Sequence, residues 1–185
     1  MLIATKYEEI YPPSIREMIK ISGDKTIVKT DILKMESQML SQLQFDFTFP
    51  TPYRVLERLS KLANADDYIQ MHAQYLLELC IADGELVSEF LPSELAAAAL
   101  AMSFKSVRKV SIGWGSAGNA LAKVTGYTEE RVAEVAAKIV AGLGKLKKFD
   151  LVGGVKKKYA KEKQFEVSKI PICTKISWWL LCVLR

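Results

Sequence analysis

The sequence contains few of the residues on which catalytic and metal sites depend. There is one histidine, His72, and the three cysteines are Cys80, Cys173 and Cys182, in a chain of 185 residues. The cysteine spacing fits neither a disulfide framework nor a zinc site, so a reducing compartment is expected. No cysteine or serine has a sequence context typical of a nucleophile, and His72 is expected to be a core or surface residue. We therefore predict no enzyme, no catalytic residue, no cofactor and no metal.

Long apolar runs and a leader sequence are also missing. The longest apolar run near the C-terminus covers residues 176–184, whereas a membrane-spanning helix requires ~20 residues. No positively charged segment followed by an apolar run stands at the beginning, so we predict no secretory signal and no membrane association. Half of the residues are apolar and the mean hydropathy is +0.09, which is typical of a globular protein. The length allows one domain or two small ones.

Charge is divided unevenly along the chain. Residues 1–100 hold 9 basic and 15 acidic residues, whereas residues 101–185 hold 17 basic and 6 acidic residues. Such a division can steer a charged partner, or it can reflect two solvated faces. The lysine-rich run at residues 156–163 has the same two interpretations, phosphate binding or a solvated helix end, and we favour the solvated one.

Apolar residues recur at three- and four-residue intervals along most of the chain, which predicts helices. Thr30 is a good N-cap for one of them, and Pro52 suits the first turn of another. Residues 45–50 alternate aromatic and polar side chains, but a lone strand is implausible in a helical chain. Residues 113–118 fit G-x-G-x-x-G, yet without a strand before them we interpret them as a loop anchored by Trp114, with nucleotide binding as the minor alternative.

One helix is expected to be buried on every side. It follows Leu91, and residues 95–102 contain no charged or strongly polar side chain. A helix that is apolar all round is surrounded by protein, and its five alanines allow neighbouring helices to come close. We therefore predict an all-α bundle with this helix at its centre. Residues 103–105 faintly resemble residues 5–7, which suggests a repeated architecture.

Residues 2–13, Leu-Ile-Ala-Thr-Lys-Tyr-Glu-Glu-Ile-Tyr-Pro-Pro, carry the most specific pattern in the chain. Their first part suits a helix, which Pro12 and Pro13 must end at or before Tyr11, because proline lacks an N–H and restricts the residue before it. A lysine and two glutamates beside two tyrosines are too much charge for a buried core. This segment is therefore predicted to form a surface that meets a partner.

This segment resembles the kinase-contacting helix end of the mitotic (A/B-type) cyclins, which has the form small-x-Lys-aromatic-Glu-Glu-Ile/Met-Tyr-Pro-Pro. The resemblance continues in the family's order over residues 2–170 and fails in the last fifteen. The other segments that carry it are Lys34-Met35-Glu36, Leu43-Gln44-Phe45-Asp46-Phe47, Pro50-Thr51-Pro52, Leu91-Pro92-Ser93, Thr125-Gly126-Tyr127-Thr128-Glu129-Glu130 and Lys157-Lys158-Tyr159.

The resemblance implies the cyclin fold, which consists of two helical repeats called cyclin boxes. Residues 1–50 correspond to helices 3–5 of the first box, residues 51–165 to a complete five-helix second box, and residues 166–185 to an atypical tail. The first two helices of the first box have no counterpart, so the resemblance implies an N-terminally truncated cyclin. We expect the partial first repeat to be marginally stable and partly exposed.

The resemblance also implies a function: binding and activating a cyclin-dependent protein kinase in cell-cycle control, in the nucleus and cytoplasm. Lys6 and Glu36 match family residues that together hold backbone groups of the kinase's small lobe. Phe45 matches an aromatic residue that packs on the kinase, or it fills the core between the repeats. The implied kinase contact comprises Lys6, Tyr7, Glu9, Ile10, Glu36, Leu40 and Phe45.

Two alternatives remain open. The same two-repeat fold occurs in basal transcription factors that bind nucleic acid, and the basic C-terminal half favours such a module, whereas residues 6–13 argue against it. The other alternative is a truncated cyclin that does not activate a kinase. Neither involves a small-molecule substrate.

Overall fold

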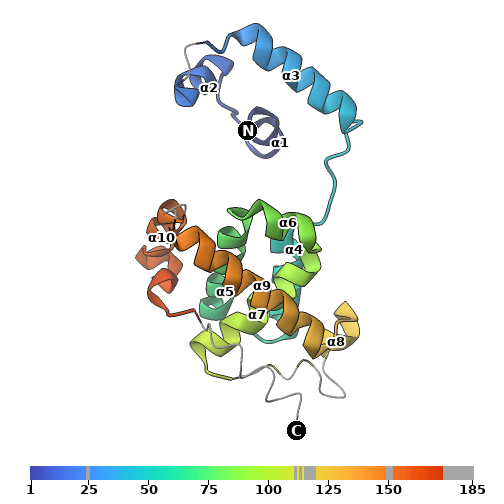
Figure 1. Ribbon diagram of the computed structural model, residues 1–185, viewed down its shortest axis with the longest axis vertical. Helices are drawn as coiled ribbons and strands as arrows, with labels where there is room; N and C mark the ends of the chain where they lie inside the picture. Colours follow the sequence, from blue (N-terminus) through green and yellow to red (C-terminus); the bar gives the residue numbers. More distant parts are fainter. Residues whose placement is uncertain (24–25, 111, 113, 115–119, 149–151, 173–185) are drawn as a thin grey trace. The chain divides into compact units, whose positions relative to one another are not determined.

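A computed structural model describes residues 1–23, 26–110, 112, 114, 120–148 and 152–172 (Figure 1). The chain divides into two compact units, Met1–Phe49 and Pro50–Arg185. All regular structure in the described ranges is helical, which confirms the predicted all-α class. The predicted loop at residues 113–118 lies outside these ranges except for Trp114, which is buried, and so do residues 173–185 of the expected tail.

The first unit contains three helices, each with an end that local chemistry explains. The proline pair after the first helix keeps it short, as predicted. The second helix opens with a capping box, in which the Ser14 backbone N–H donates to the Glu17 carboxylate at 2.6 Å and the Glu17 N–H donates to the Ser14 hydroxyl at 3.3 Å. The helices are α1 (Leu2–Glu8), α2 (Ile15–Ser22) and α3 (Lys29–Gln42).

Thr30 does not cap α3, so that prediction is wrong. The helix begins two residues earlier than a Thr30 cap requires, at Lys29, and Val28 holds the N-cap position with an extended backbone and no side-chain hydrogen bond. The Val28 carbonyl accepts from the Asp31 N–H at 3.1 Å and from the Ile32 N–H at 3.4 Å, which places Thr30 inside the helix. A hydroxyl caps a helix only from the flanking extended position, which Thr30 does not occupy.

No described residue of the first unit is buried. Large apolar side chains remain open there, with Ile10 88% exposed and Phe45 68% exposed. All fully buried hydrophobic side chains in the described ranges belong to the second unit. Because burial of apolar area is the main favourable term in folding, the first unit has little of its own to stabilise it.

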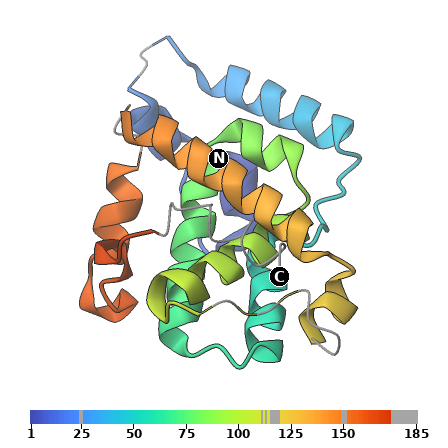
Figure 2. The same ribbon diagram turned by 60° about the horizontal axis from the view of Figure 1, so that its bottom comes forward.

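The second unit is a helical bundle around α7, which contacts α4, α5 and α9 (Figures 1 and 2). Every residue from Glu94 to Phe104 is buried, which confirms the predicted central helix. The helices of this unit are α4 (Pro52–Leu62), α5 (Asp67–Ile81), α6 (Gly84–Glu89), α7 (Pro92–Val107), α8 (Ala120–Thr125), α9 (Glu129–Lys148) and α10 (Gly153–Tyr159), followed by 3-10 turns at Glu162–Gln164 and Val167–Lys169.

Close packing around the core explains Gly142, which lies inside α9. A Cβ atom there would lie 2.5 Å from Asp83 Oδ2 and 2.8 Å from Leu86 Cδ1, both on the segment that forms the start of α6. Glycine lowers helix propensity by about 1 kcal/mol relative to alanine. Here the missing side chain lets α9 lie against α6.

His72 lies in the core between α5 and α7 with no exposed surface. Its Nδ1 atom is 2.9 Å from the Ser103 hydroxyl oxygen, and that hydroxyl donates its own hydrogen to the Ala99 carbonyl at 2.8 Å. Ser103 must therefore accept, so Nδ1 carries the hydrogen and donates it. The other ring nitrogen, Nε2, has no partner among the described residues. Burial lowers the pKa of His72 to about 4.

We expect acid to weaken the second unit through His72. Between about pH 6.5 and about pH 4, the unfolded chain takes up a proton at this residue that the folded chain excludes. The free energy of unfolding should therefore fall over this interval by an amount on the order of 3 kcal/mol. Urea denaturation followed by circular dichroism at the two ends of the interval measures the loss.

The variant His72→Gln is the control, because glutamine does not titrate. It should retain only the pH dependence that comes from the carboxylates. The same pH dependence in both proteins would contradict the role assigned to His72.

Backbone hydrogen exchange should separate the two units. Amides of α1 and α3 are expected to exchange at least ~100-fold faster than amides of α7. The first unit has no buried residue, so local unfolding there breaks few contacts and costs little free energy. Mass spectrometry of peptic fragments from the labelled chain measures both rates. Equal and strong protection in the two units would refute this expectation.

Candidate partner-binding surface

The structure brings together Lys6 of α1 and Glu36 of α3, which are 30 residues apart in sequence. The Lys6 ammonium donates to Glu36 Oε1 at 2.7 Å. The Lys6 side chain is 46% exposed and the Glu36 side chain is 12% exposed, so the lysine stays open to solvent while the glutamate is largely covered. The ion pair thus links α1 to α3.

A pocket of about 340 Å³ surrounds this ion pair. Four of the seven residues predicted for the contact line it: Lys6, Tyr7, Glu36 and Leu40. Its complete lining is Ile3, Lys6, Tyr7, Glu36, Leu40 and Phe47. The pocket therefore combines apolar walls with one charged pair, an arrangement suited to a protein partner that presents both backbone polar groups and apolar side chains.

The other three predicted residues do not line the pocket. Glu9 directly follows α1, where its extended backbone ends the helix. Ile10 is exposed, and Phe45 lies in a turn after α3 with a positive φ of 57°. All three are open to solvent next to the segments that form the pocket.

Phe47 belongs to the pocket and was not predicted as a site residue. Its ring centroid lies 5.8 Å from that of Tyr7, at an interplanar angle of 53°. The alternation of aromatic and polar residues after α3 includes both Phe45 and Phe47, but the pattern alone does not tell which of the two rings contacts α1. Phe45 was selected instead because the family resemblance pointed to it.

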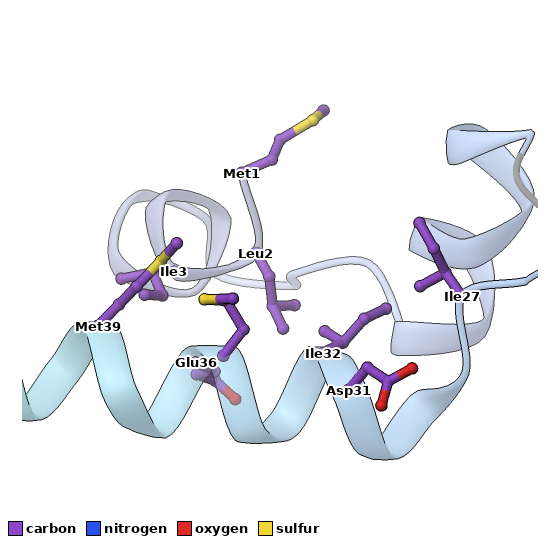
Figure 3. A pocket seen from close by; sticks show the side chains of 9 residues that line it. Met1, Leu2, Ile3, Ile27, Asp31, Ile32, Glu36 and Met39 are labelled. Atoms are coloured by element: carbon purple, nitrogen blue, oxygen red, sulfur yellow. The ribbon is translucent and has the colours of Figure 1, made fainter.

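A second pocket, of about 380 Å³, lies between α1 and α3 (Figure 3). Leu2 and Ile3 of α1 face Ile32 and Met39 of α3 across it. Its complete lining is Met1, Leu2, Ile3, Ile27, Asp31, Ile32, Met35, Glu36 and Met39. Ile3 and Glu36 line both pockets, so they form the wall between them.

None of the described His, Cys, Asp and Glu side chains form a group of three that could hold a metal ion. Among the helices that the structure describes, none is long and apolar enough to cross a membrane.

The basic run near α10 is partly neutralised. Lys158 pairs with Glu78 of α5 at 2.5 Å, and Tyr159 donates its hydroxyl hydrogen to the same carboxylate at 2.7 Å. Lys156 and Lys157 remain exposed. At least one cation of this run therefore anchors α10 to α5.

Comparison with known families identifies both units. The family described as cyclin, C-terminal domain, matches residues 50–172, about two thirds of the chain. The chain belongs to the cyclin family. The family described as cyclin, N-terminal domain, matches residues 1–48, so the Lys6–Glu36 pair lies in the region similar to an N-terminal cyclin domain.

Its curated relatives include B-type cyclins. The chain is 37% identical over 164 residues to Cyclin-B2-4 of Arabidopsis thaliana, covering 86% of this chain and 35% of that protein. It is 36% identical over 172 residues to G2/mitotic-specific cyclin-B2 of Rana japonica, covering 92% of this chain and 42% of that protein. The cyclin chain thus spans well under two thirds of the length of these relatives.

We expect the single variants Lys6→Ala and Glu36→Ala to fold normally. Each should change the free energy of unfolding by less than about 1 kcal/mol, because the lysine is half exposed and water screens the pair. Urea denaturation of the three proteins measures the change. A loss of several kcal/mol in either variant would mean that the pair holds the first unit together.

Proposed function

We propose that this cyclin is a regulatory subunit that binds and activates a cyclin-dependent protein kinase in cell-cycle control. The proposed contact is formed by Lys6, Tyr7, Glu9, Ile10, Glu36, Leu40 and Phe45. The observation that carries the proposal is the Lys6–Glu36 ion pair in the first unit, at the wall of an apolar pocket. A location in the nucleus and cytoplasm belongs to the same proposal.

The ion pair can recognise backbone groups without depending on the partner's side chains. An ammonium group has three N–H donors, and Lys6 uses one of them on Glu36 Oε1. Two donors remain for carbonyl groups of a partner. The second oxygen of Glu36 can accept from a partner's backbone N–H. Lys6 therefore offers hydrogen-bond donors and Glu36 offers an acceptor. Together they match the carbonyl and N–H groups that a turn or helix end of the kinase presents.

The proposed effect on the kinase is positional. A protein kinase transfers phosphate only when its own lysine–glutamate pair and its magnesium site are aligned, which depends on the position of its regulatory helix. A cyclin that holds this helix in place supplies no reacting group. The apolar side chains around the ion pair, such as Tyr7 and Leu40, would exclude water from the contact and strengthen its polar interactions.

Calorimetric titration of the chain into a purified cyclin-dependent kinase subunit tests this proposal. The double variant Lys6→Ala/Glu36→Ala is expected to weaken binding by about 2–5 kcal/mol, because it leaves partner backbone groups desolvated and unpaired.

The matched control is Lys145→Ala/Glu85→Ala, which removes an exposed lysine–glutamate ion pair from the second unit. It should bind as tightly as the parent protein. If the parent binds and both double variants bind equally well, Lys6 and Glu36 do not form the contact. If the folded parent does not bind, the proposed function itself is wrong.

A further inference from the structure

A separate pocket of about 370 Å³ lies within the second unit, lined by side chains of α4, of the start of α7, and of the end of α8 and the turn after it. Residues of the proposed kinase contact take no part in it. Its lining is Arg54, Val55, Arg58, Leu59, Ser93, Val124, Thr125 and Tyr127. The lining contains two cations, three hydroxyl groups and no carboxylate.

The two arginines lie one helical turn apart on α4, so their guanidinium groups share one face of the helix. Arg54 is paired only loosely, since its Nη1 lies 3.3 Å from Glu57 Oε2 and its side chain is 77% exposed. Arg58 makes no ion pair or hydrogen bond within the described part of the chain. The pocket therefore holds more positive charge than its surroundings neutralise.

A hydroxyl hydrogen is also free to donate into this pocket. The Ser93 and Tyr127 oxygens lie 2.7 Å apart and share one hydrogen bond, which uses only one of their two hydrogens. Thr125 has none to spare, because its hydroxyl donates to the Leu121 carbonyl at 2.8 Å. Donors to an incoming anion are thus the two guanidinium groups and one hydroxyl.

The rest of the lining is apolar. Val55 and Leu59 of α4 and Val124 of α8 lie beside the charged groups. Leu59 is buried, whereas a free inorganic ion would leave Val55 and Val124 in contact with water. A ligand that carries its charge on an apolar stem would cover them and gain the free energy of burying apolar area.

We propose that this pocket binds a phosphorylated serine or threonine in a segment of a partner protein. A phosphate monoester carries a charge near −2 and three oxygen acceptors. Two guanidinium forks match that charge and geometry, since each can donate two parallel hydrogen bonds. The free hydroxyl serves the third oxygen, and the apolar side chains receive the stem of the phosphorylated residue. A carboxylate carries a charge of only −1, so it would match the two guanidinium groups less well than a phosphate monoester does.

Fluorescence anisotropy tests the proposal with a labelled seven-residue peptide that carries phosphothreonine at its centre between two leucines. Binding to the full chain is expected to be at least ~10-fold tighter than that of the unphosphorylated peptide, a difference of about 1.4 kcal/mol. The double variant Arg54→Ala/Arg58→Ala should lose this preference. The double variant Ser93→Ala/Tyr127→Phe, which removes both hydroxyl groups of the pair, should weaken phosphopeptide binding several-fold.

The matched control is Lys61→Ala/Lys123→Ala, which removes the same net charge from exposed positions on α4 and α8 outside the pocket. It should keep the preference for the phosphorylated peptide. Three results would overturn the proposal: equal affinity for the two peptides, equal losses in both double variants, or inorganic phosphate competing as strongly as the phosphopeptide. A single-stranded oligonucleotide that binds with the same arginine dependence and displaces the phosphopeptide would assign the pocket to nucleic acid instead.

Discussion

The burial of α7 on every side is the constraint on which the second unit depends. The small alanine side chains of α7 let α4, α5 and α9 pack close to its backbone. The positions of these helices therefore depend on the side chains of α7 staying small. Adding methylene groups to such a core commonly costs about 1–3 kcal/mol. The same packing fixes α4 and the start of α7, which carry the arginines and the serine of the proposed phosphate pocket.

The first unit is organised in a different way. It buries no described residue. One half-exposed ion pair joins α1 to α3, an aromatic contact between Tyr7 and Phe47 joins α1 to the segment after α3, and two pockets are left open beside these contacts. Surface ion pairs contribute little to stability. The Lys6–Glu36 pair is therefore better suited to orient its ammonium and carboxylate groups toward a partner than to hold the two helices together. In the proposed complex, the kinase would supply apolar contacts that the unit does not make by itself.

The sequence predicted the features that one segment determines by itself. An uninterrupted apolar stretch predicted α7, and prolines predicted the end of α1 and the start of α4. The association of Lys6 with Glu36, which lie on two segments, was expected only from the family resemblance. Other features that depend on distant segments were missed. Arg54 and Arg58 look like a solvated helix face until Ser93 and Tyr127 lie opposite them, and Gly142 looks like a weak point of α9 until the approach of α6 is known. Thr30 was misplaced because a capping preference is weaker than the backbone geometry that starts the helix.

The most direct test of the proposed division between the two units is hydrogen exchange of the chain mixed with a purified cyclin-dependent kinase. We predict that amides in residues 2–10 and 36–47 become protected, because the kinase covers α1, the end of α3 and the aromatic segment that follows. Amides of α7 should exchange as slowly as in the free chain. New protection confined to the second unit, with residues 2–10 and 36–47 unchanged, would contradict the assignment of the kinase contact to the first unit.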